Sequence, residues 1–236
     1  MKIAVLGTGG GGRAHAARLV ELGHEVFVGT RDPEATLART EPDMMGNVPF
    51  GNWLAEHPGV TLLTFGEAAA AADEVVISGI DGHSAVAALS AIAEPLAGKT
   101  LIDYGVPYVY NPDAEHPWPT PWGVMPKLDP CDTDSLGERI QRALPRTKVV
   151  KAFVTQEQET VVDPAAVSGE HTMFVAGEDD AAKQHAKDLL EAYGWSDVLD
   201  LGPLVCARGM EMYAHLHSAI GFALGFGTPF GIKVVR

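Results

Sequence analysis

The 236-residue sequence has little cysteine, few basic residues and no long apolar run. Its two cysteines, Cys131 and Cys206, are too few for a disulfide framework or a cysteine-rich metal site. With 17 lysines and arginines against 31 aspartates and glutamates, the net charge is −14, which argues against nucleic acid and anionic membrane surfaces as partners. The most apolar late stretch, residues 218–232, is too short to span a bilayer. We therefore expect a cytoplasmic protein that acts on a small molecule.

The chain also lacks a convincing metal site. The pair His215 and His217 is separated by one residue within an expected helix. Residues two apart on a helix point to nearly opposite faces, so these two imidazoles are poorly placed to hold one ion. We predict no metal.

Glycine, by contrast, is concentrated near the start. Residues 2–6 form an apolar run typical of a buried parallel strand, and residues 13–22 have a helical pattern. Between them, glycines 7, 9 and 12 follow the G-x-G-x-x-G spacing, which allows a tight turn, close approach of a pyrophosphate and close packing of helix on strand. A plain glycine-rich turn is the alternative. The motif predicts that a dinucleotide binds at Gly7, Thr8, Gly9, Gly10, Gly11 and Gly12, at the helix N-terminus.

The end of the second expected strand, residues 24–28, indicates which dinucleotide binds. An NAD site usually has an acidic residue there to bind the ribose 2′-hydroxyl, whereas this chain has Thr30 and Arg31. A hydroxyl and a guanidinium suit a 2′-phosphate, because arginine binds it through a charge-assisted fork. Asp32 comes one residue later and is expected to cap the helix that Pro33 opens. We predict NADP(H) as the cofactor, with a solvated Arg31 as the alternative.

Apolar runs and helical stretches alternate through much of the chain. Further strands are expected at residues 60–65, 74–78, 99–104, 148–154, 171–176 and 197–200. Helices are expected at residues 67–72, 85–92, 179–193 and 203–226. This alternation predicts an α/β, doubly wound, mostly parallel sheet of the Rossmann type.

One segment breaks the alternation. Residues 105–130 contain seven prolines, two tryptophans and two tyrosines, with no helical or strand periodicity. Because the segment follows the carboxyl end of a strand, where open α/β sheets bind ligands, we interpret it as a pocket wall or lid. A surface loop or a dimer contact is the alternative.

Seven short motifs occur in a fixed order: residues 1–9 (MKIAVLGTG), 22–26 (LGHEV), 28–31 (VGTR), 148–151 (KVVK), 174–179 (FVAGED), 200–204 (DLGPL) and 230–233 (FGIK). In order and spacing they resemble the NADP oxidoreductases that use an 8-hydroxy-5-deazaflavin coenzyme, coenzyme F-420. The resemblance implies an NADP-binding Rossmann domain over residues 1–155 and a small C-terminal α/β portion over residues 156–236 for substrate binding or dimerisation. It also implies that Thr8, Thr30 and Arg31 surround the 2′-phosphate, and that the protein is a homodimer.

The sequence departs from that family at three places. Gly10 and Gly11 replace a bulkier pair in the glycine turn, which widens the turn without preventing binding. Residues 156–159 (QEQE) replace small or apolar residues, and the segment 107–121 is longer than expected. These last two departures lie where the second substrate is expected, so they concern the deazaflavin more than NADPH.

The expected chemistry needs few residues. Hydride transfer from a nicotinamide to a deazaflavin requires mainly alignment of two rings, whereas reduction of a C=O or C=N bond also requires a proton donor. We predict Tyr104, Glu157 and His217 as catalytic residues, and Ser78, Gly79 and Ile80 as the lining of the nicotinamide ribose. Each catalytic residue has a structural alternative: Tyr104 as a packed aromatic, Glu157 as a solvated loop acid and His217 as a core or dimer contact.

Three functions follow in order of preference. The first is an NADPH-dependent oxidoreductase that exchanges hydride with a deazaflavin coenzyme. The second is a biosynthetic reductase that acts directly on a C=N, C=O or C=C bond. The third is a non-catalytic NADPH-binding protein.

Overall fold

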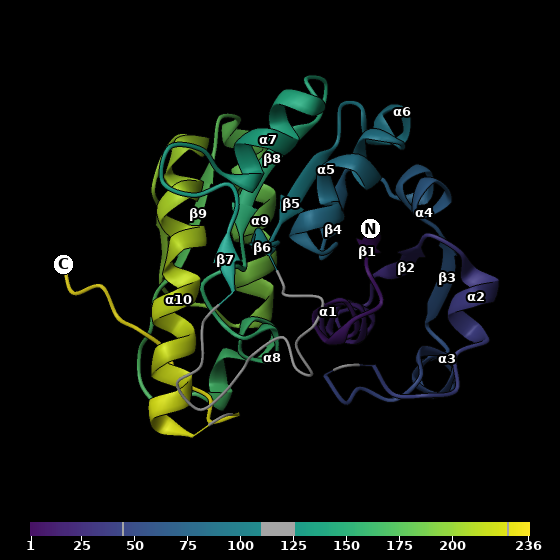
Figure 1. Cartoon of the computed structure of the whole chain (residues 1–236), viewed down its shortest axis with the longest axis horizontal. Coiled ribbons are helices and arrows are strands. Elements are labelled where there is room, and N and C mark those ends of the chain that lie inside the picture. The colour runs from purple at the N-terminus through teal and green to yellow at the C-terminus, as the bar shows by residue number, and fades with distance from the viewer. Residues whose placement is uncertain (44, 110–125, 226) are drawn as a thin grey trace.

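The computed structural model describes residues 1–43, 45–109, 126–225 and 227–236, and it is built on one large sheet (Figure 1). Eight strands lie in the order β10-β9-β8-β5-β4-β1-β2-β3. Their bounds are β1 (Lys2–Leu6), β2 (Glu25–Thr30), β3 (Val60–Thr64), β4 (Val75–Ser78), β5 (Thr100–Asp103), β8 (Lys148–Ala152), β9 (Met173–Gly177) and β10 (Val198–Asp200). The six strands from β3 to β8 are mutually parallel and have the connectivity of a Rossmann sheet. The predicted fold class is confirmed.

The sheet changes direction once, between β8 and β9. These two strands pair in antiparallel fashion, with Lys151 opposite Ala176, and β10 then runs parallel to β9. The domain boundary expected after residue 155 lies three residues after the end of β8. The strands beyond it, β9 and β10, belong to the same sheet as β8. The division into two domains stays a prediction.

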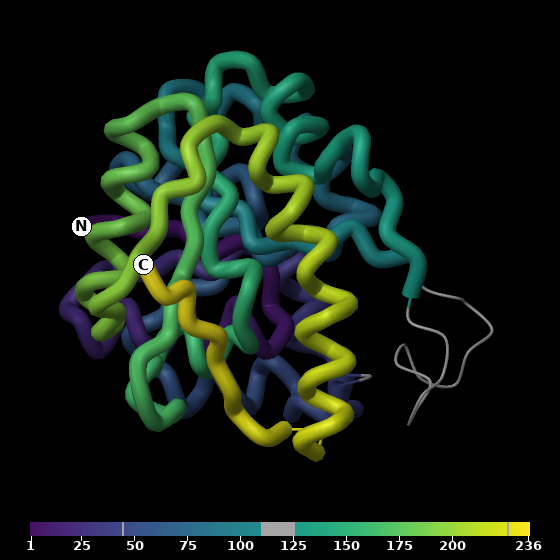
Figure 2. Tube along the Cα trace, turned by 90° about the vertical axis from the view of Figure 1, so that its left-hand side faces the viewer, coloured from purple at the N-terminus to yellow at the C-terminus, as the bar shows by residue number. Residues whose placement is uncertain are grey.

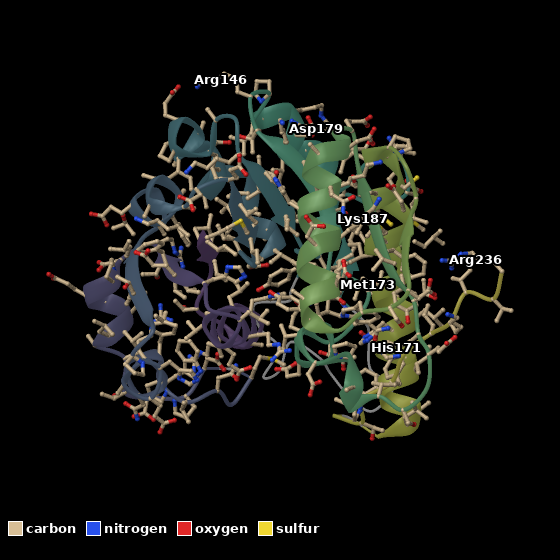
Figure 3. The ribbon with its side chains drawn as sticks, turned by 180° about the vertical axis from the view of Figure 1, so that it is seen from behind. Arg146, His171, Met173, Asp179, Lys187 and Arg236 are labelled. Carbon is tan, nitrogen blue, oxygen red and sulfur yellow. The ribbon has the colours of Figure 1, made fainter. Side chains whose placement is uncertain are left out.

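Helices cover both faces of the sheet. They are α1 (Gly10–Glu21), α2 (Pro33–Leu37), α3 (Phe50–Ala55), α4 (Phe65–Ala71), α5 (Gly82–Ser90), α6 (Ala93–Leu96), α7 (Leu136–Ala143), α8 (Gln158–Val162), α9 (Asp180–Tyr193) and α10 (Ala207–Leu224), with short 3-10 helices at Pro164–Ala166 and Leu204–Cys206. One apolar core joins the sheet to α1, α3, α8 and α9, and a second joins it to α4, α5, α6, α7 and the start of α10. Figure 3 views the first face, with Asp179 at the start of α9 and Lys187 farther along it.

The segment that was expected to lack strands forms a small separate pairing where it is described. Strands β6 (Tyr108–Val109) and β7 (Lys127–Leu128) pair in antiparallel fashion at its two ends. Most of the pocket wall or lid predicted for residues 105–130 lies outside the described residues.

The chain ends by returning toward the sheet after α10 (Figure 2). The amide of Thr172 donates to the carbonyl of Ile232, and Asp197 pairs with Lys233 and Arg236. The ring of Phe230 lies 4.6 Å from that of His217 on α10. These contacts attach the last residues to the start of β9 and to α10.

Among the described residues, no helix is both long enough and apolar enough to cross a bilayer.

Candidate active site

Glycines stand where the carboxyl ends of β1 and β4 lie side by side, which is the place where such folds have a ligand crevice. Gly7 has a φ of +125°, and a Cβ there would lie 2.9 Å from the carbonyl oxygen of Gly79. A Cβ at Gly12 would lie 2.2 Å from the carbonyl oxygen of Gly7, whereas one at Gly9 would meet nothing within 4 Å. Gly7 and Gly12 therefore allow close packing, and Gly9 leaves space. The crevice lies at the switch point of the sheet, where such folds bind dinucleotides.

The N-terminus of α1 faces this crevice without a side-chain cap. Its N-cap is Gly9, which has no side chain to accept from the first amides of the helix. Those amides and the positive end of the helix dipole suit a pyrophosphate. The open space at Gly9 and the uncapped helix fit the group that the sequence predicted.

The end of β2 carries a hydroxyl and a free cation. Thr30 is buried, and its hydroxyl lies 2.8 Å from that of Thr36, which donates to the carbonyl of Asp32. Asp32 caps α2 by accepting from the amide of Ala35, as expected. The guanidinium of Arg31 is exposed and has no acidic partner in the described parts of the chain. It is therefore available to an anion.

Ser78 ends β4, and Gly79 and Ile80 follow it directly. The hydroxyl of Ser78 is fully buried and has no hydrogen-bond partner among the described residues. Ile80 is 7% exposed. An unpaired buried hydroxyl is costly unless a ligand or water binds it, so the predicted contact of Ser78 with a ligand would satisfy it.

Tyr104, which follows β5, reaches across the crevice. A Cβ at Gly79 would lie 1.8 Å from its hydroxyl oxygen, and a Cβ at Gly11 would lie 2.9 Å from the same atom. Burial, with the negative charges of Asp103 and Glu159, raises the pKa of Tyr104. Its phenol therefore stays protonated at neutral pH.

A neutral polar chain lies behind the Tyr104 ring. His15 of α1 stacks on Tyr104 and Phe153 at centroid distances of 5.4 Å and 5.0 Å. Its Nε2 lies 2.9 Å from Oε1 of Gln158, and its Nδ1 lies 3.0 Å from the hydroxyl of Tyr193. Because the amide nitrogen of Gln158 donates to the carbonyl of Phe153, its oxygen accepts from Nε2 of His15. The tautomer is thereby assigned: Nδ1 accepts from Tyr193. Burial lowers the pKa of His15 to about 4.

A charged cluster lies beneath the same tyrosine. The ammonium of Lys151 is 2.7 Å from Asp103 and 2.8 Å from Glu211 of α10, and it donates to the carbonyl of Gly105. Glu211 also accepts from the amides of Leu136 and Gly137 at the start of α7. Desolvation would lower the pKa of Lys151, but the two carboxylates outweigh it and the pKa is raised. The ammonium therefore stays charged although the residue is fully buried.

The other two predicted catalytic residues lie near each other. Nδ1 of His217 lies 3.7 Å from a carboxylate oxygen of Glu157, whose side chain is 65% exposed. Nε2 of His217 and the hydroxyl of Tyr213, one turn earlier, are buried without hydrogen-bond partners among the described residues. Desolvation lowers the pKa of His217, which favours the neutral imidazole. Tyr104 does not join them: its ring stacks on His15 and packs against the cluster of Val154 and Met210.

Four residues of this region were not predicted as site residues: His15, Gln158, Tyr193 and Glu211. The sequence did contain a signal for His15, because it places a histidine three residues after Gly12 on the first expected helix. The signal for Glu211 was weaker: this acid follows Met210 within the helix expected at residues 203–226. Lys151 is fully buried on β8, which fits a structural role.

Comparisons with known proteins agree with this geometry. The model of a family described as NADP oxidoreductase, coenzyme F420-dependent, matches residues 2–107. A crystal structure of a candidate F420-dependent NADP reductase from Arthrobacter sp. FB24 is 46% identical, covers 100% of both chains and superposes with a TM-score of 0.90.

Two curated relatives are more distant. The F420-dependent NADP reductase of Methanothermobacter marburgensis is 35% identical over 109 residues, which is 45% of each protein. Metalloreductase STEAP3 of Rattus norvegicus is 28% identical over 211 residues, which is 89% of this chain and 36% of the relative. The chain thus spans less than half the length of both curated relatives.

Proposed function

Because the chain belongs to the family of coenzyme F420-dependent NADP oxidoreductases, we propose that it transfers hydride between NADPH and a deazaflavin coenzyme of the F420 type. The family makes the protein an NADP-dependent oxidoreductase. The observation that carries the finer proposal is the 46% identity, over the full length of both chains, to the Arthrobacter protein. The reaction converts NADPH, oxidised deazaflavin and a proton into NADP⁺ and the dihydrodeazaflavin.

The coenzyme is proposed to lie along the carboxyl edge of the sheet. The amides of Gly9, Gly10, Gly11 and Gly12 would bind the pyrophosphate, and Gly7 would allow the turn that presents them. Thr8, Thr30 and Arg31 would surround the 2′-phosphate. Ser78, Gly79 and Ile80 would contact the nicotinamide ribose. The uncapped helix, the exposed Arg31 and the unpaired hydroxyl of Ser78 support this placement.

When bound, NADPH supplies the hydride, and the protein supplies alignment. The crevice would fix the nicotinamide against the sheet edge, with one ring face toward the acceptor. Tyr104, backed by the stacked rings of His15 and Phe153, would limit water at that end. Because His15 is neutral, it adds no charge that would oppose the positive charge of the oxidised nicotinamide.

Two measurements test this function. Addition of NADPH to the protein and oxidised 8-hydroxy-5-deazaflavin should bleach the visible absorbance of the deazaflavin. Replacement of Arg31 by alanine should weaken NADPH binding about 10- to 100-fold, because a hydrogen-bonded charge is lost, and should leave NADH binding unchanged. The matched control is Arg39→Ala, which removes another exposed arginine nearby. Equal NADPH affinity in the Arg31 variant and the native protein would contradict the cofactor assignment.

A second candidate function is direct reduction of a C=N, C=O or C=C bond in a small molecule. The position of the Tyr104 hydroxyl at the crevice favours it, because such reductions need a hydrogen-bond or proton donor beside the nicotinamide. NADPH oxidation with a cyclic imine or enone, and none with the deazaflavin, would select this candidate. Loss of that rate in Glu157→Gln would then assign a role to Glu157.

We also propose that the protein is a homodimer joined through α10. Met212, Leu216, Ile220 and Leu224 stand at every fourth position of this helix, and three of them are 44–57% exposed. An apolar stripe of this kind is usually covered by a partner. Sedimentation of the native protein as a dimer, and of Leu216→Glu as a monomer, is the expected result.

A further inference from the structure

Two glycines, Gly11 and Gly79, lie next to the hydroxyl oxygen of Tyr104. A Cβ at Gly79 would also lie 2.3 Å from Cζ of that ring, and a Cβ at Gly11 would lie 2.7 Å from Cγ of Gln158. Neither glycine has a left-handed φ, so both positions need glycine for space and not for backbone conformation. A side chain at either position would overlap the phenol, so the two glycines provide the space that its hydroxyl occupies at the crevice.

The tyrosine is held on both sides of its backbone and on one face of its ring. Its amide donates to the carbonyl of Ser78, and Lys151 binds both Asp103 before it and the carbonyl of Gly105 after it. The ring stacks on His15, which is itself held by Gln158 and Tyr193. Such a residue is positioned before a ligand arrives, and preorganised donors are effective in catalysis.

The hydroxyl itself is free. Among the described residues it has no hydrogen-bond partner, and Tyr104 is only partly buried. A fixed donor with a free hydrogen, between the start of α1 and the residue after β4, lies where the crevice would bring the reacting end of the coenzyme.

We propose that the Tyr104 hydroxyl donates a hydrogen bond to the oxygen or nitrogen that is bonded to, or conjugated with, the hydride-accepting carbon of the substrate. This inference rests on the proposed hydride transfer from NADPH. The hydride forms a new C–H bond at that carbon. In an imine the π pair of the C=N bond moves directly onto nitrogen. In an enone or a deazaflavin the C=C π pair moves to form the neighbouring double bond, and the C=O π pair moves onto oxygen. The hydrogen bond stabilises this charge until a proton from solvent neutralises the product. The raised pKa of the phenol keeps the hydrogen in place at neutral pH.

The acceptor class follows from this role. It is an imine, whose nitrogen is bonded to the reacting carbon, or a conjugated carbonyl, whose oxygen is linked to the reacting carbon through a C=C–C=O system. A deazaflavin has this arrangement through its ring carbonyl, and so do cyclic enones and cyclic imines. The probes are therefore oxidised 8-hydroxy-5-deazaflavin, 2-cyclohexenone and 2-methyl-1-pyrroline.

The test compares Tyr104→Phe with the native protein. We expect kcat to fall about 10²- to 10³-fold, as for removal of one oxyanion donor, with the Kd for NADPH unchanged. The kinetic isotope effect with NADPH deuterated at the transferred position should rise, because hydride transfer becomes fully rate-limiting. A structural disturbance alone would weaken NADPH binding and would not raise the isotope effect.

The matched control is Tyr193→Phe. It also removes one hydroxyl from the same aromatic group, but that hydroxyl bonds to His15 and lies away from the crevice. Because this change loosens only the support of His15 behind the ring, kcat is expected to fall much less than in Tyr104→Phe, and the isotope effect should stay at the native value. Gly79→Ala, whose Cβ would overlap the hydroxyl, should lower kcat in the native protein and should add little to Tyr104→Ala.

The possible results separate the two proposals. Reduction of the enone or imine but not the deazaflavin, with the rate loss in Tyr104→Phe retained, contradicts the deazaflavin assignment and supports the role of Tyr104. Native kcat in Tyr104→Phe overturns that role, and so does reduction of none of the three probes by the native protein. Tighter NADPH binding in Tyr104→Phe with kcat retained would show a tyrosine that merely covers the crevice, which also overturns it.

Discussion

Two buried clusters hold Tyr104 from opposite sides, and they differ in charge. On one side the ammonium of Lys151 binds the carboxylates of Asp103 and Glu211. On the other, neutral His15 is hydrogen-bonded to Tyr193 and Gln158. Both Lys151 and His15 are 0% exposed, so both clusters have lost all contact with water at their central group.

The difference shows what each kind of group requires in order to be buried. The charged cluster contains two carboxylates for one ammonium, and the excess negative charge meets two amides at the N-terminus of α7. The neutral cluster needs only a donor for Nδ1 and an acceptor for Nε2, because His15 has given up its proton. A charge must be matched by charges, whereas a neutral ring needs only matched hydrogen bonds.

The largest expected effect comes from removing the central charge. Lys151→Met keeps the chain length but leaves Asp103 and Glu211 buried without a cation. We expect the free energy of unfolding in urea to fall by about 3–5 kcal/mol, the usual cost of breaking a buried ion pair on one side.

The matched control for that change is Lys187→Met on α9 (Figure 3). Lys187 pairs with Asp200 at 2.8 Å, but both side chains are about one-third exposed. This variant should lose only about 0–1 kcal/mol. Equal losses in the two variants would show that burial of the charge is not what distinguishes the clusters.

The neutral cluster should respond to acid. The pKa of His15 is lowered from 6.5 to about 4. Between these pH values the unfolded chain is protonated at His15 and the folded protein is not. The stability from His15 is fully present above pH 6.5 and is lost as pH falls toward 4. At about 1.4 kcal/mol per pKa unit, the loss reaches about 3 kcal/mol.

Comparison of the native protein with His15→Phe isolates the pH-dependent stability that His15 contributes, since the two proteins share every other titrating group. Urea unfolding at several pH values should show a steeper decline between pH 6.5 and 4 for the native protein. Parallel stability curves would mean that His15 can be protonated in the folded state.

The smallest effect is expected from the edge of the neutral cluster. Tyr193→Phe removes the hydroxyl that donates to Nδ1 of His15 and leaves one buried acceptor unpaired. The expected loss in the free energy of unfolding is about 1–3 kcal/mol, toward the lower end because the ring and its packing remain. Thermal unfolding at pH 7 measures it. A loss as large as that of Lys151→Met would remove the contrast between the clusters.

Local patterns in the sequence predicted much of the coenzyme side. The spacing of Gly7, Gly9 and Gly12 reflects a steric requirement of this turn. In the structure a Cβ at Gly7 or Gly12 would overlap neighbouring backbone atoms. Asp32 caps α2 because its partner amide is only three residues away. The contacts of Arg31 and Ser78 with a coenzyme remain predictions.

Distance along the chain explains what was missed. Gln158 meets His15 across 143 residues, and Glu211 meets the start of α7 across about 75. Nothing in the QEQE run at residues 156–159 distinguishes one polar side chain from the next, yet Gln156 is buried and Gln158 packs against Gly11. Two separate departures from the family, at Gly11 and at Gln158, thus meet at one contact.

By itself the sequence determined the order of the strands along the chain, the glycine turn and the capped helices, because each depends on neighbours within a few residues. The tertiary structure alone decided that Tyr104 lies between Gly11 and Gly79, that Lys151 is ionised in the interior and that His15 is neutral. Those outcomes depend on which distant groups share a space without water, and burial with its partners sets the charge of a residue there.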